Sequence, residues 1–169
     1  LNALAAAAAG QEAGLSLHEI RTGLESFAGV AMRFSVKNHN DITWLADIYN
    51  ANPSSMDLAI NELMQYKDSG KRMVAVLGDM LELGAQTYEL HAGLGKRLLQ
   101  QQIDFFIGVG SHMRAAVKAY GDKACSAADA EEAAEILRRV LRAGDVVLVK
   151  GSRGMFMEKI FEALGVPLT

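Results

Sequence analysis

The stretch Val146-Val147-Leu148-Val149-Lys150-Gly151-Ser152-Arg153-Gly154 is the segment that best predicts the fold of this chain. Its four leading aliphatic residues show no polar alternation, which predicts a strand buried on both faces. A polar, glycine-containing loop follows, and residues 155–164 have the composition of a helix. A strand of this kind that leads into a helix is typical of a parallel sheet covered by helices.

The same arrangement recurs along the preceding hundred residues. Apolar runs predict strands at 42–49, 73–77 and 105–109, and a brief one at 123–125. Helices are expected from a capping box at 54–57 to Gly70, at 88–101, at 111–120, and after a capping box at 126–129. This alternation predicts an α/β fold: a doubly wound, mostly parallel sheet with helices on both faces.

The N-terminal segment has a different texture. Residues 2–9 are nearly all alanine and predict a helix that Gly10 ends. A capping box at 16–19 predicts a second helix, and residues 29–33 have the composition of a connector. Two helices are too little to fold alone, so we expect them to be the tail of a preceding domain. The chain opens at Leu1, and we expect it to be a fragment of a longer protein.

Composition limits the classes of function. The 169 residues are 50% hydrophobic and 22% charged, which suffices for one domain with a core. The net charge of −3 argues against non-specific nucleic-acid binding. The single Cys125 excludes an internal disulfide and fits a reducing compartment. No apolar run has transmembrane length, and no cysteine–histidine cluster has metal-ligand spacing. We therefore expect no membrane insertion and no metal site in this chain.

Ligands of doubly wound folds bind beyond the carboxyl ends of the strands, where three loops are expected, at 50–53, 78–84 and 150–154. The third loop has the strongest physical case for a site. Lys150 and Arg153 add positive charge to a helix N-terminus, and its glycines permit close approach of the backbone to an anion. The alternative is a polar turn with two solvated cations. The spacing of a nucleotide P-loop is absent.

The other two loops leave alternatives open. Asn50 and Asn52 offer uncharged donors and acceptors, but asparagines that cap a turn are the more common case. Asp79 could bind a hydroxyl, an ammonium group or a metal, or could cap the next helix. The turn 108–110 hints at a dinucleotide fingerprint, but its third glycine is missing, so we interpret it as a tight turn. A lone histidine such as His91 is usually packed or solvated.

Three motifs in register carry a family resemblance: Asp47-x-Tyr49-Asn50-Ala51-Asn52-Pro53, Val76-Leu77-Gly78-Asp79-Met80-Leu81-Glu82-Leu83-Gly84 and Val149-Lys150-Gly151-Ser152-Arg153. Their order and spacing resemble the C-terminal domain of Mur ligases, specifically the branch that adds D-alanyl-D-alanine to UDP-N-acetylmuramoyl-tripeptide. His91 also falls where that family has a histidine. The resemblance implies that residues 1–32 are the helical tail of a central ATPase domain with its connector. It implies that residues 33–169 are the Rossmann-like C-terminal α/β domain.

The resemblance implies a cytoplasmic, monomeric ligase of peptidoglycan synthesis. ATP and Mg²⁺ activate the carboxylate of the UDP-linked tripeptide as an acyl phosphate, which the amine of D-alanyl-D-alanine attacks. The P-loop and the metal ligands of the family lie in the central domain, so the fragment alone is expected to be inactive. The alternatives are a Mur ligase that adds a single amino acid, or a non-catalytic Rossmann-type nucleotide-binding module.

The resemblance also assigns roles to individual residues. The residues expected to bind ATP are Arg33, Asp47, Tyr49 and Asn50. Those expected to face the dipeptide or the acyl phosphate are Asn52, Asp79, Gly151, Ser152 and Arg153, and Lys150 is expected to be catalytic. Three positions depart from the family pattern: Met32, Ala46 and Ile48 stand where a glycine, an acidic residue and a small hydroxyl residue are usual.

Overall fold

The computed structural model describes residues 2–27 and 33–168. The chain divides into two compact units, Leu1–Val30 and Ala31–Thr169. Among the described residues, no helix combines the length and the apolar character that a membrane crossing requires.

The first unit is a pair of helices, α1 (Asn2–Glu12) and α2 (Leu17–Glu25). The capping box that begins α2 is confirmed, because the side chains of Ser16 and Glu19 each accept a hydrogen bond from the other residue's main-chain N–H. The prediction that Gly10 ends α1 is wrong. A Cβ at Gly10 would lie 3.0 Å from Cγ1 of Ile20, so this glycine permits the close contact between the two helices.

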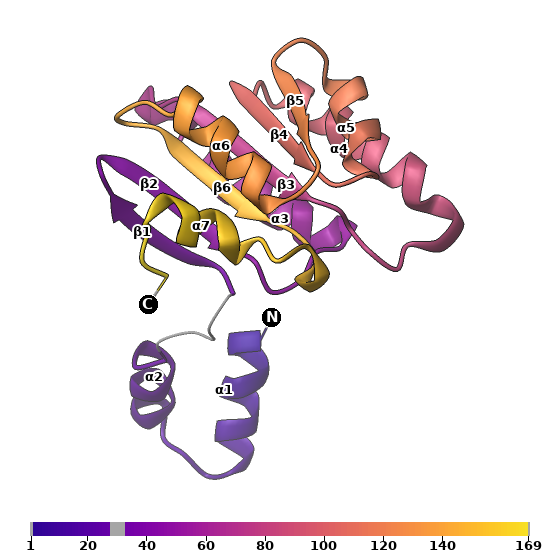
Figure 1. Ribbon diagram of the computed structural model, residues 1–169. Coiled ribbons are helices and arrows are strands. Elements are labelled where there is room, and N and C mark those ends of the chain that lie inside the picture. Colours follow the sequence, from indigo (N-terminus) through magenta and orange to yellow (C-terminus); the bar gives the residue numbers. More distant parts are fainter. Residues whose placement is uncertain (1, 28–32, 169) are drawn as a thin grey trace. The chain divides into compact units, whose positions relative to one another are not determined.

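The second unit is built on a six-stranded sheet (Figure 1). Its strands are β1 (Ser35–His39), β2 (Ile42–Asp47), β3 (Met73–Gly78), β4 (Phe105–Val109), β5 (Ala124–Ala127) and β6 (Val146–Lys150). The spatial order is β1-β2-β6-β3-β4-β5, and every neighbouring pair is parallel except the β1–β2 hairpin. The predicted mostly parallel α/β fold is confirmed. Because β6 lies between β2 and β3, the loops that follow these three strands emerge side by side.

Helices cover both faces of this sheet (Figure 1). One face packs against α3 (Pro53–Met64), α4 (Thr87–Gln100) and α5 (Met113–Tyr120), and the other against α6 (Ala130–Val140) and α7 (Glu158–Leu164). Alternate residues of one strand serve the two cores. In β3, Ala75 and Leu77 belong to the α3–α5 core, whereas Val74 and Val76 belong to the α6–α7 core. This alternation explains why the strand is apolar throughout.

Helix starts differ from the predictions in two places. α3 is capped by Asn52, whose side-chain oxygen accepts from the N–H of Ser55 at 2.9 Å, and not by a box that starts at residue 54. α6 is capped by Asp129, which accepts from the N–H of Glu132 at 2.9 Å. Asn52 and Asp129 both have the extended backbone that is typical of an N-cap. Pro53 follows Asn52 as the first residue of α3, where the fixed φ of proline suits a helix.

Two further predictions are corrected. Gly70 ends a short 3-10 turn (Lys67–Ser69) rather than α3, which ends at Met64. The last helix begins at Glu158, after a 3-10 turn at Arg153–Met155. β1 was not predicted, because this edge strand alternates between half-buried and exposed residues and has no apolar run.

Candidate functional site

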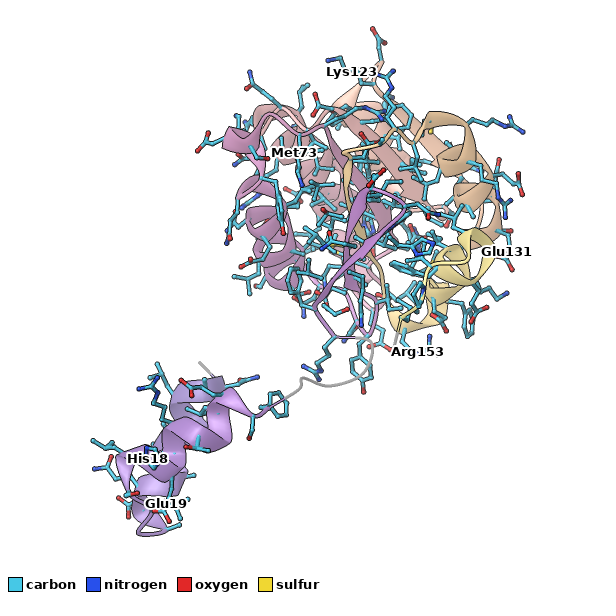
Figure 2. All side chains as sticks on the ribbon, turned by 90° about the vertical axis from the view of Figure 1, so that its left-hand side faces the viewer. His18, Glu19, Met73, Lys123, Glu131 and Arg153 are labelled. Carbon is cyan, nitrogen blue, oxygen red and sulfur yellow. The ribbon has the colours of Figure 1, made fainter. Side chains whose placement is uncertain are left out.

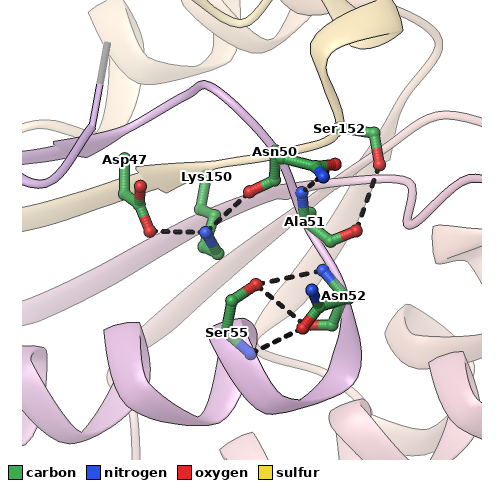
Figure 3. Close-up of polar contacts among 7 residues, drawn as sticks. All are labelled: Asp47, Asn50, Ala51, Asn52, Ser55, Lys150 and Ser152. Carbon is green, nitrogen blue, oxygen red and sulfur yellow. Dashed lines mark hydrogen bonds and ion pairs between the residues drawn. The ribbon is translucent and has the colours of Figure 1, made fainter. Parts of the chain in front are cut away.

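The three predicted loops meet at the carboxyl ends of β2, β3 and β6, and Ser152 joins them. Its hydroxyl donates to the carbonyl of Ala51 at 3.4 Å (Figure 3). The same hydroxyl accepts from the N–H of Leu81 at 3.0 Å. Its own N–H donates to the carbonyl of Asp79 at 3.2 Å. One buried serine therefore holds the loops after β2 and β3 against the loop after β6.

Lys150 is buried between the ends of β2 and β6. It faces Asp47 in the strand register, and only 1% of the residue is exposed. Its ammonium pairs with the Asp47 carboxylate and donates to the carbonyl of Asn50 at 2.8 Å (Figure 3). Lys150 is thus not one of the two solvated cations that the alternative interpretation of this loop required.

Arg153 belongs to the outer part of the same loop and reaches the molecular surface (Figure 2). Its guanidinium pairs with Glu158 at 2.6 Å and lies 5.6 Å from the ring centre of Phe156. About half of its side chain is exposed. The loop therefore combines a buried cation with an exposed one.

Gly151 and Gly78 bring the ends of β6 and β3 into close contact. A Cβ at Gly151 would lie 2.8 Å from Cγ of Met157 and 3.1 Å from Cα of Gly78. Contacts within the protein therefore explain the glycine at position 151 without a ligand. The prediction that Gly151 admits a ligand to the backbone stays a prediction.

Asp79 is buried at the end of β3 and faces the start of α5. Its carboxylate accepts from the N–H groups of His112 at 3.2 Å and Met113 at 2.8 Å. Gly110 has φ 104°, and a Cβ there would lie 2.5 Å from this carboxylate. The turn 108–110 is therefore filled by Asp79. The Asp79 carboxylate caps α5 rather than α4, the next helix in the chain. That Asp79 contacts a ligand stays a prediction.

The residues expected to bind ATP gather around the end of β2. The Arg33 guanidinium lies 4.9 Å from the ring centre of Tyr49, which is 45% exposed. The side chain of Asn50 accepts from the N–H of Ala51 at 2.8 Å, and Asn52 caps α3 (Figure 3). Arg33 and Tyr49 thus present a cation and an aromatic face to solvent.

Two small pockets with Tyr49 and Asn50 in common lie in this cluster. The first, of 230 Å³, is lined by Arg33, Asp47, Tyr49, Asn50, Asn52, Ser55 and Lys150. The second, of 280 Å³, is lined by Tyr49, Asn50, Leu81, Glu82, Ser152, Arg153 and Gly154. Of the residues assigned from the sequence, Asp79 and Gly151 line neither pocket and lie behind the loops.

Leu81 and Glu82 belong to the second motif, but their residue types and spacing predict no role for them. Glu82 has φ 64°, a left-handed conformation that residues other than glycine rarely adopt. The apolar Leu81 and the acidic Glu82 next to each other were the available signal, but the backbone geometry that exposes them was not readable from the sequence.

His91 was also given no catalytic or binding role, and the structure confirms that it is packed, with 0% of the residue exposed. Its Nδ1 lies 2.6 Å from the carbonyl of Thr87, and its Nε2 lies 3.1 Å from the main-chain nitrogen of Met80. Since carbonyls only accept and N–H groups only donate, the ring is the neutral Nδ1–H tautomer. Burial lowers the pKa of His91 below its ordinary value of 6.5, in agreement with that neutral form.

The departures from the family pattern fall in different surroundings. Ala46 and Ile48 are buried in the α6–α7 core, where Ile48 adds apolar volume. Met32 lies outside the described residues. In the described part of the chain, no three histidine, cysteine or acidic residues are grouped so that they could hold a metal ion.

The fold and the loop cluster define a doubly wound α/β domain with a candidate ligand site at the carboxyl edge of its sheet. Residues 32–153 match the family described as "Mur ligase, glutamate ligase domain". The chain therefore belongs to the Mur ligase family.

Relatives within this family carry a more specific name. A UDP-N-acetylmuramoyl-tripeptide–D-alanyl-D-alanine ligase from Escherichia coli is 36% identical over 96% of this chain and 36% of its own length. Crystal structure II of MurF from Acinetobacter baumannii has a TM-score of 0.88 and 31% identity, over 96% of this chain and 36% of its own. MurF from Thermotoga maritima, solved in complex with ADP, has a TM-score of 0.79 and 27% identity over 95% of this chain and 36% of its own. The chain thus spans little more than a third of the length of the relatives it matches.

Proposed function

We propose that this chain is the C-terminal domain of a ligase that adds D-alanyl-D-alanine to UDP-N-acetylmuramoyl-tripeptide in peptidoglycan synthesis. The observation that carries the proposal is the joining of three motif loops by Ser152 into one cluster beside two pockets. The names of the relatives from E. coli and A. baumannii support it. Since those relatives are nearly three times as long, we assign the activity to the whole parent protein and expect the chain alone to be inactive.

ATP would be bound at the 230 Å³ pocket. When bound, it supplies the phosphoryl group that turns the tripeptide carboxylate into an acyl phosphate. The exposed Arg33 guanidinium suits phosphate oxygens, and the Tyr49 ring offers a stacking face. Asp47 and Asn50 supply acceptors for ribose or base atoms. The ADP complex of the T. maritima relative supports a nucleotide in the parent protein.

The incoming dipeptide would be bound at the 280 Å³ pocket. D-alanyl-D-alanine carries a carboxylate, an ammonium group and two methyl groups. Arg153 suits the carboxylate, Glu82 suits the ammonium group, and Leu81 suits a methyl group. Gly151 and Asp79 fix the loops from behind, Ser152 joins the loops at the wall of this pocket, and Asn52 fixes the start of α3. Direct contact of these four residues with the dipeptide or the acyl phosphate remains part of the proposal.

Lys150 would act at the boundary between the two subsites. Its ammonium lines the ATP pocket and holds both the Asp47 carboxylate and the Asn50 carbonyl. We assign it two roles: positioning these two groups, and placing a positive charge near the phosphates as negative charge develops. The ligands of Mg²⁺ would come from the part of the parent ligase outside this chain.

The helical pair α1–α2 would be the tail of the central ATPase domain, with the boundary at residues 32–33. An apolar groove of 550 Å³ runs between these helices and is lined by residues that include Ala6, Leu15, Leu24 and Phe27. Such a groove is the surface expected where a short helical segment has lost its packing partner. We also propose a monomeric, cytoplasmic parent, and the single cysteine of this chain fits a reducing compartment.

The test is ADP release by the intact parent protein supplied with ATP, Mg²⁺ and the UDP-linked tripeptide. D-alanyl-D-alanine is compared with D-alanine, L-lysine and D-glutamate as the amine. Release that requires the dipeptide would support the proposal. Release with a single amino acid would place the parent in another branch of the family, and release with none of them would refute the assignment to the branch that adds the dipeptide. The isolated chain serves as the control and should release no ADP.

A further inference from the structure

The loop after β3 is held through three consecutive main-chain N–H groups. The N–H of Asp79 donates to the carbonyl of Val109 at 3.0 Å, and that of Leu81 donates to the Ser152 hydroxyl at 3.0 Å. Between them, the N–H of Met80 donates to Nε2 of His91 at 3.1 Å. The three acceptors come from the end of β4, from α4 and from the loop after β6. The base of the loop is therefore fixed from three directions.

This fixed base leads directly to the side chains that line the 280 Å³ pocket. Leu81 and Glu82 follow Met80, and Glu82 has the left-handed φ of 64°. A residue with a Cβ pays a conformational cost in this region, so it remains there only when its surroundings hold it. Losing the bond at Met80 would allow Glu82 to relax and would move both side chains relative to the pocket.

Only one of the three acceptors, His91, changes its protonation near neutral pH. A carbonyl and a hydroxyl accept at any pH, whereas Nε2 of His91 accepts only while the ring is neutral. The titratable groups that face the ring are Asp79, which favours its protonated form, and His112, whose ring centre is 5.7 Å away and which disfavours it. On its own helix the ring meets the Thr87 carbonyl. Burial outweighs the favourable contributions, so the pKa of His91 lies below 6.5.

We propose that His91 is a positioning residue for the dipeptide subsite: its neutral ring fixes the main chain at Met80 and so presents Leu81 and Glu82 to the pocket. Protonation would turn Nε2 into a donor that faces another donor, and the loop would be released. The use of the loop for the dipeptide rests on the proposed function, but the bond between His91 and Met80 can be tested without it.

Two substitutions separate the two ring nitrogens. In His91→Gln, the side-chain carbonyl oxygen can take the place of Nε2 and still accept from Met80, but it does not titrate. In His91→Asn, the shorter amide can still donate to Thr87, as Nδ1–H does, but cannot reach Met80. Both variants remove the imidazole from the same buried position. A difference between them therefore reports on the bond to the loop and not on the loss of the ring.

The first measurement is hydrogen exchange at the Met80 amide of this chain by NMR, expressed as a protection factor between pH 5 and 8. In the wild type we expect a constant factor above pH 6.5 and a decline as the pH falls below it. His91→Gln should keep the protection and lose its pH dependence. In His91→Asn, the protection factor of the Met80 amide should be lower on the order of tenfold at every pH, which is the effect of about one hydrogen bond. Equal protection in all three proteins, or equal loss in both variants, would overturn the proposal.

The second measurement uses the intact parent ligase. His91→Asn should raise KM for D-alanyl-D-alanine on the order of tenfold and leave KM for ATP unchanged, because the ATP pocket does not include this loop. An unchanged KM for the dipeptide, or an equal rise in both constants, would contradict a positioning role. If the wild-type parent does not use the dipeptide at all, the proposed function fails, and exchange at Met80 still decides the role of His91 in the loop.

Discussion

The parallel strands bury charged groups at both of their ends, here called the amino edge and the carboxyl edge of the sheet. The charged groups have different surroundings at the two ends. At the amino edge, Asp145 is 1% exposed and accepts from the Arg72 guanidinium and from the N–H of Arg142, each at 2.9 Å. Arg72 also donates to the carbonyl of Val140 at 2.9 Å. At the carboxyl edge, Lys150 is equally buried and pairs with Asp47 and the Asn50 carbonyl.

The difference lies in what each network supports. The amino-edge bonds connect the turns before β3 and β6 to one another. A polar pocket does lie at the β1–β2 turn on that side, but neither Arg72 nor Asp145 lines it. At the carboxyl edge, Lys150 and Ser152 hold loops whose outer side chains, Tyr49 and Leu81 among them, line two pockets. Burial of a charge is therefore common to both ends of the strands, and the two ends differ in whether the buried cation itself lines a pocket, as Lys150 does.

The largest effect on stability is expected for Lys150→Met. The substitution leaves the partly buried Asp47 carboxylate without its partner, and breaking such a pair costs about 3 kcal/mol of unfolding free energy. Urea denaturation of the chain measures this. Lys159→Met is the control, because Lys159 pairs with Glu131 but is 47% exposed, and no resolvable loss is expected there. Equal losses of unfolding free energy in the two variants would mean that the buried Lys150–Asp47 pair stabilises the fold no more than an exposed ion pair does.

Asp145→Asn tests the opposite edge. It keeps the shape of the side chain but weakens the bonds from Arg72 and Arg142, at a cost of about 2 kcal/mol. The parent ligase that carries this substitution should keep its kcat and both KM values at temperatures where it stays folded. A changed KM with intact folding would show that the amino edge is not purely structural, and would remove the distinction between the edges.

Ser152→Ala should combine a smaller loss of stability with an effect on the ligand. It leaves the N–H of Leu81, which makes a part-buried hydrogen bond to the serine, without its acceptor, and this costs about 1 kcal/mol. In the parent ligase, KM for the dipeptide should rise, since the loops are no longer joined. Ser54→Ala, at an exposed serine in the first turn of α3, is the matched control and should change neither property. An unaltered KM in Ser152→Ala would limit the serine to a packing role.

The smallest effect on stability is expected for Arg33→Ala. This exposed side chain contacts the ring of Tyr49, and its removal should change the unfolding free energy by less than about 0.5 kcal/mol. Calorimetry should nevertheless show that the parent ligase with Arg33→Ala binds ATP more weakly than the wild type does. Arg139→Ala, at an exposed position on α6, controls for the loss of one positive charge. Equal affinities in Arg33→Ala and wild type would exclude Arg33 from the ATP site.

The sequence by itself determined the class of fold and the family. Strands that face two helical layers must be apolar at every position, so β3 and β6 were visible as local runs such as residues 146–149. The three motif loops were also recognisable, because their residues, order and spacing resemble those of the Mur ligase family. β1 escaped this approach, since an edge strand is half solvated and its pattern is that of an ordinary polar segment.

Only the tertiary structure decided what the loop residues do. Lys150 and Arg153 are three positions apart and carry the same charge, yet one is buried and the other exposed. The cause is the insertion of β6 between β2 and β3, which sets Lys150 opposite Asp47, 103 positions earlier in the chain. The contact between the loops after β3 and β6 likewise brings Ser152 to Leu81, 71 positions earlier, and the packing of α4 against the loop before it brings His91 to Met80. Sequence periodicity reports which face of an element is buried, but it carries no information about which distant element covers that face.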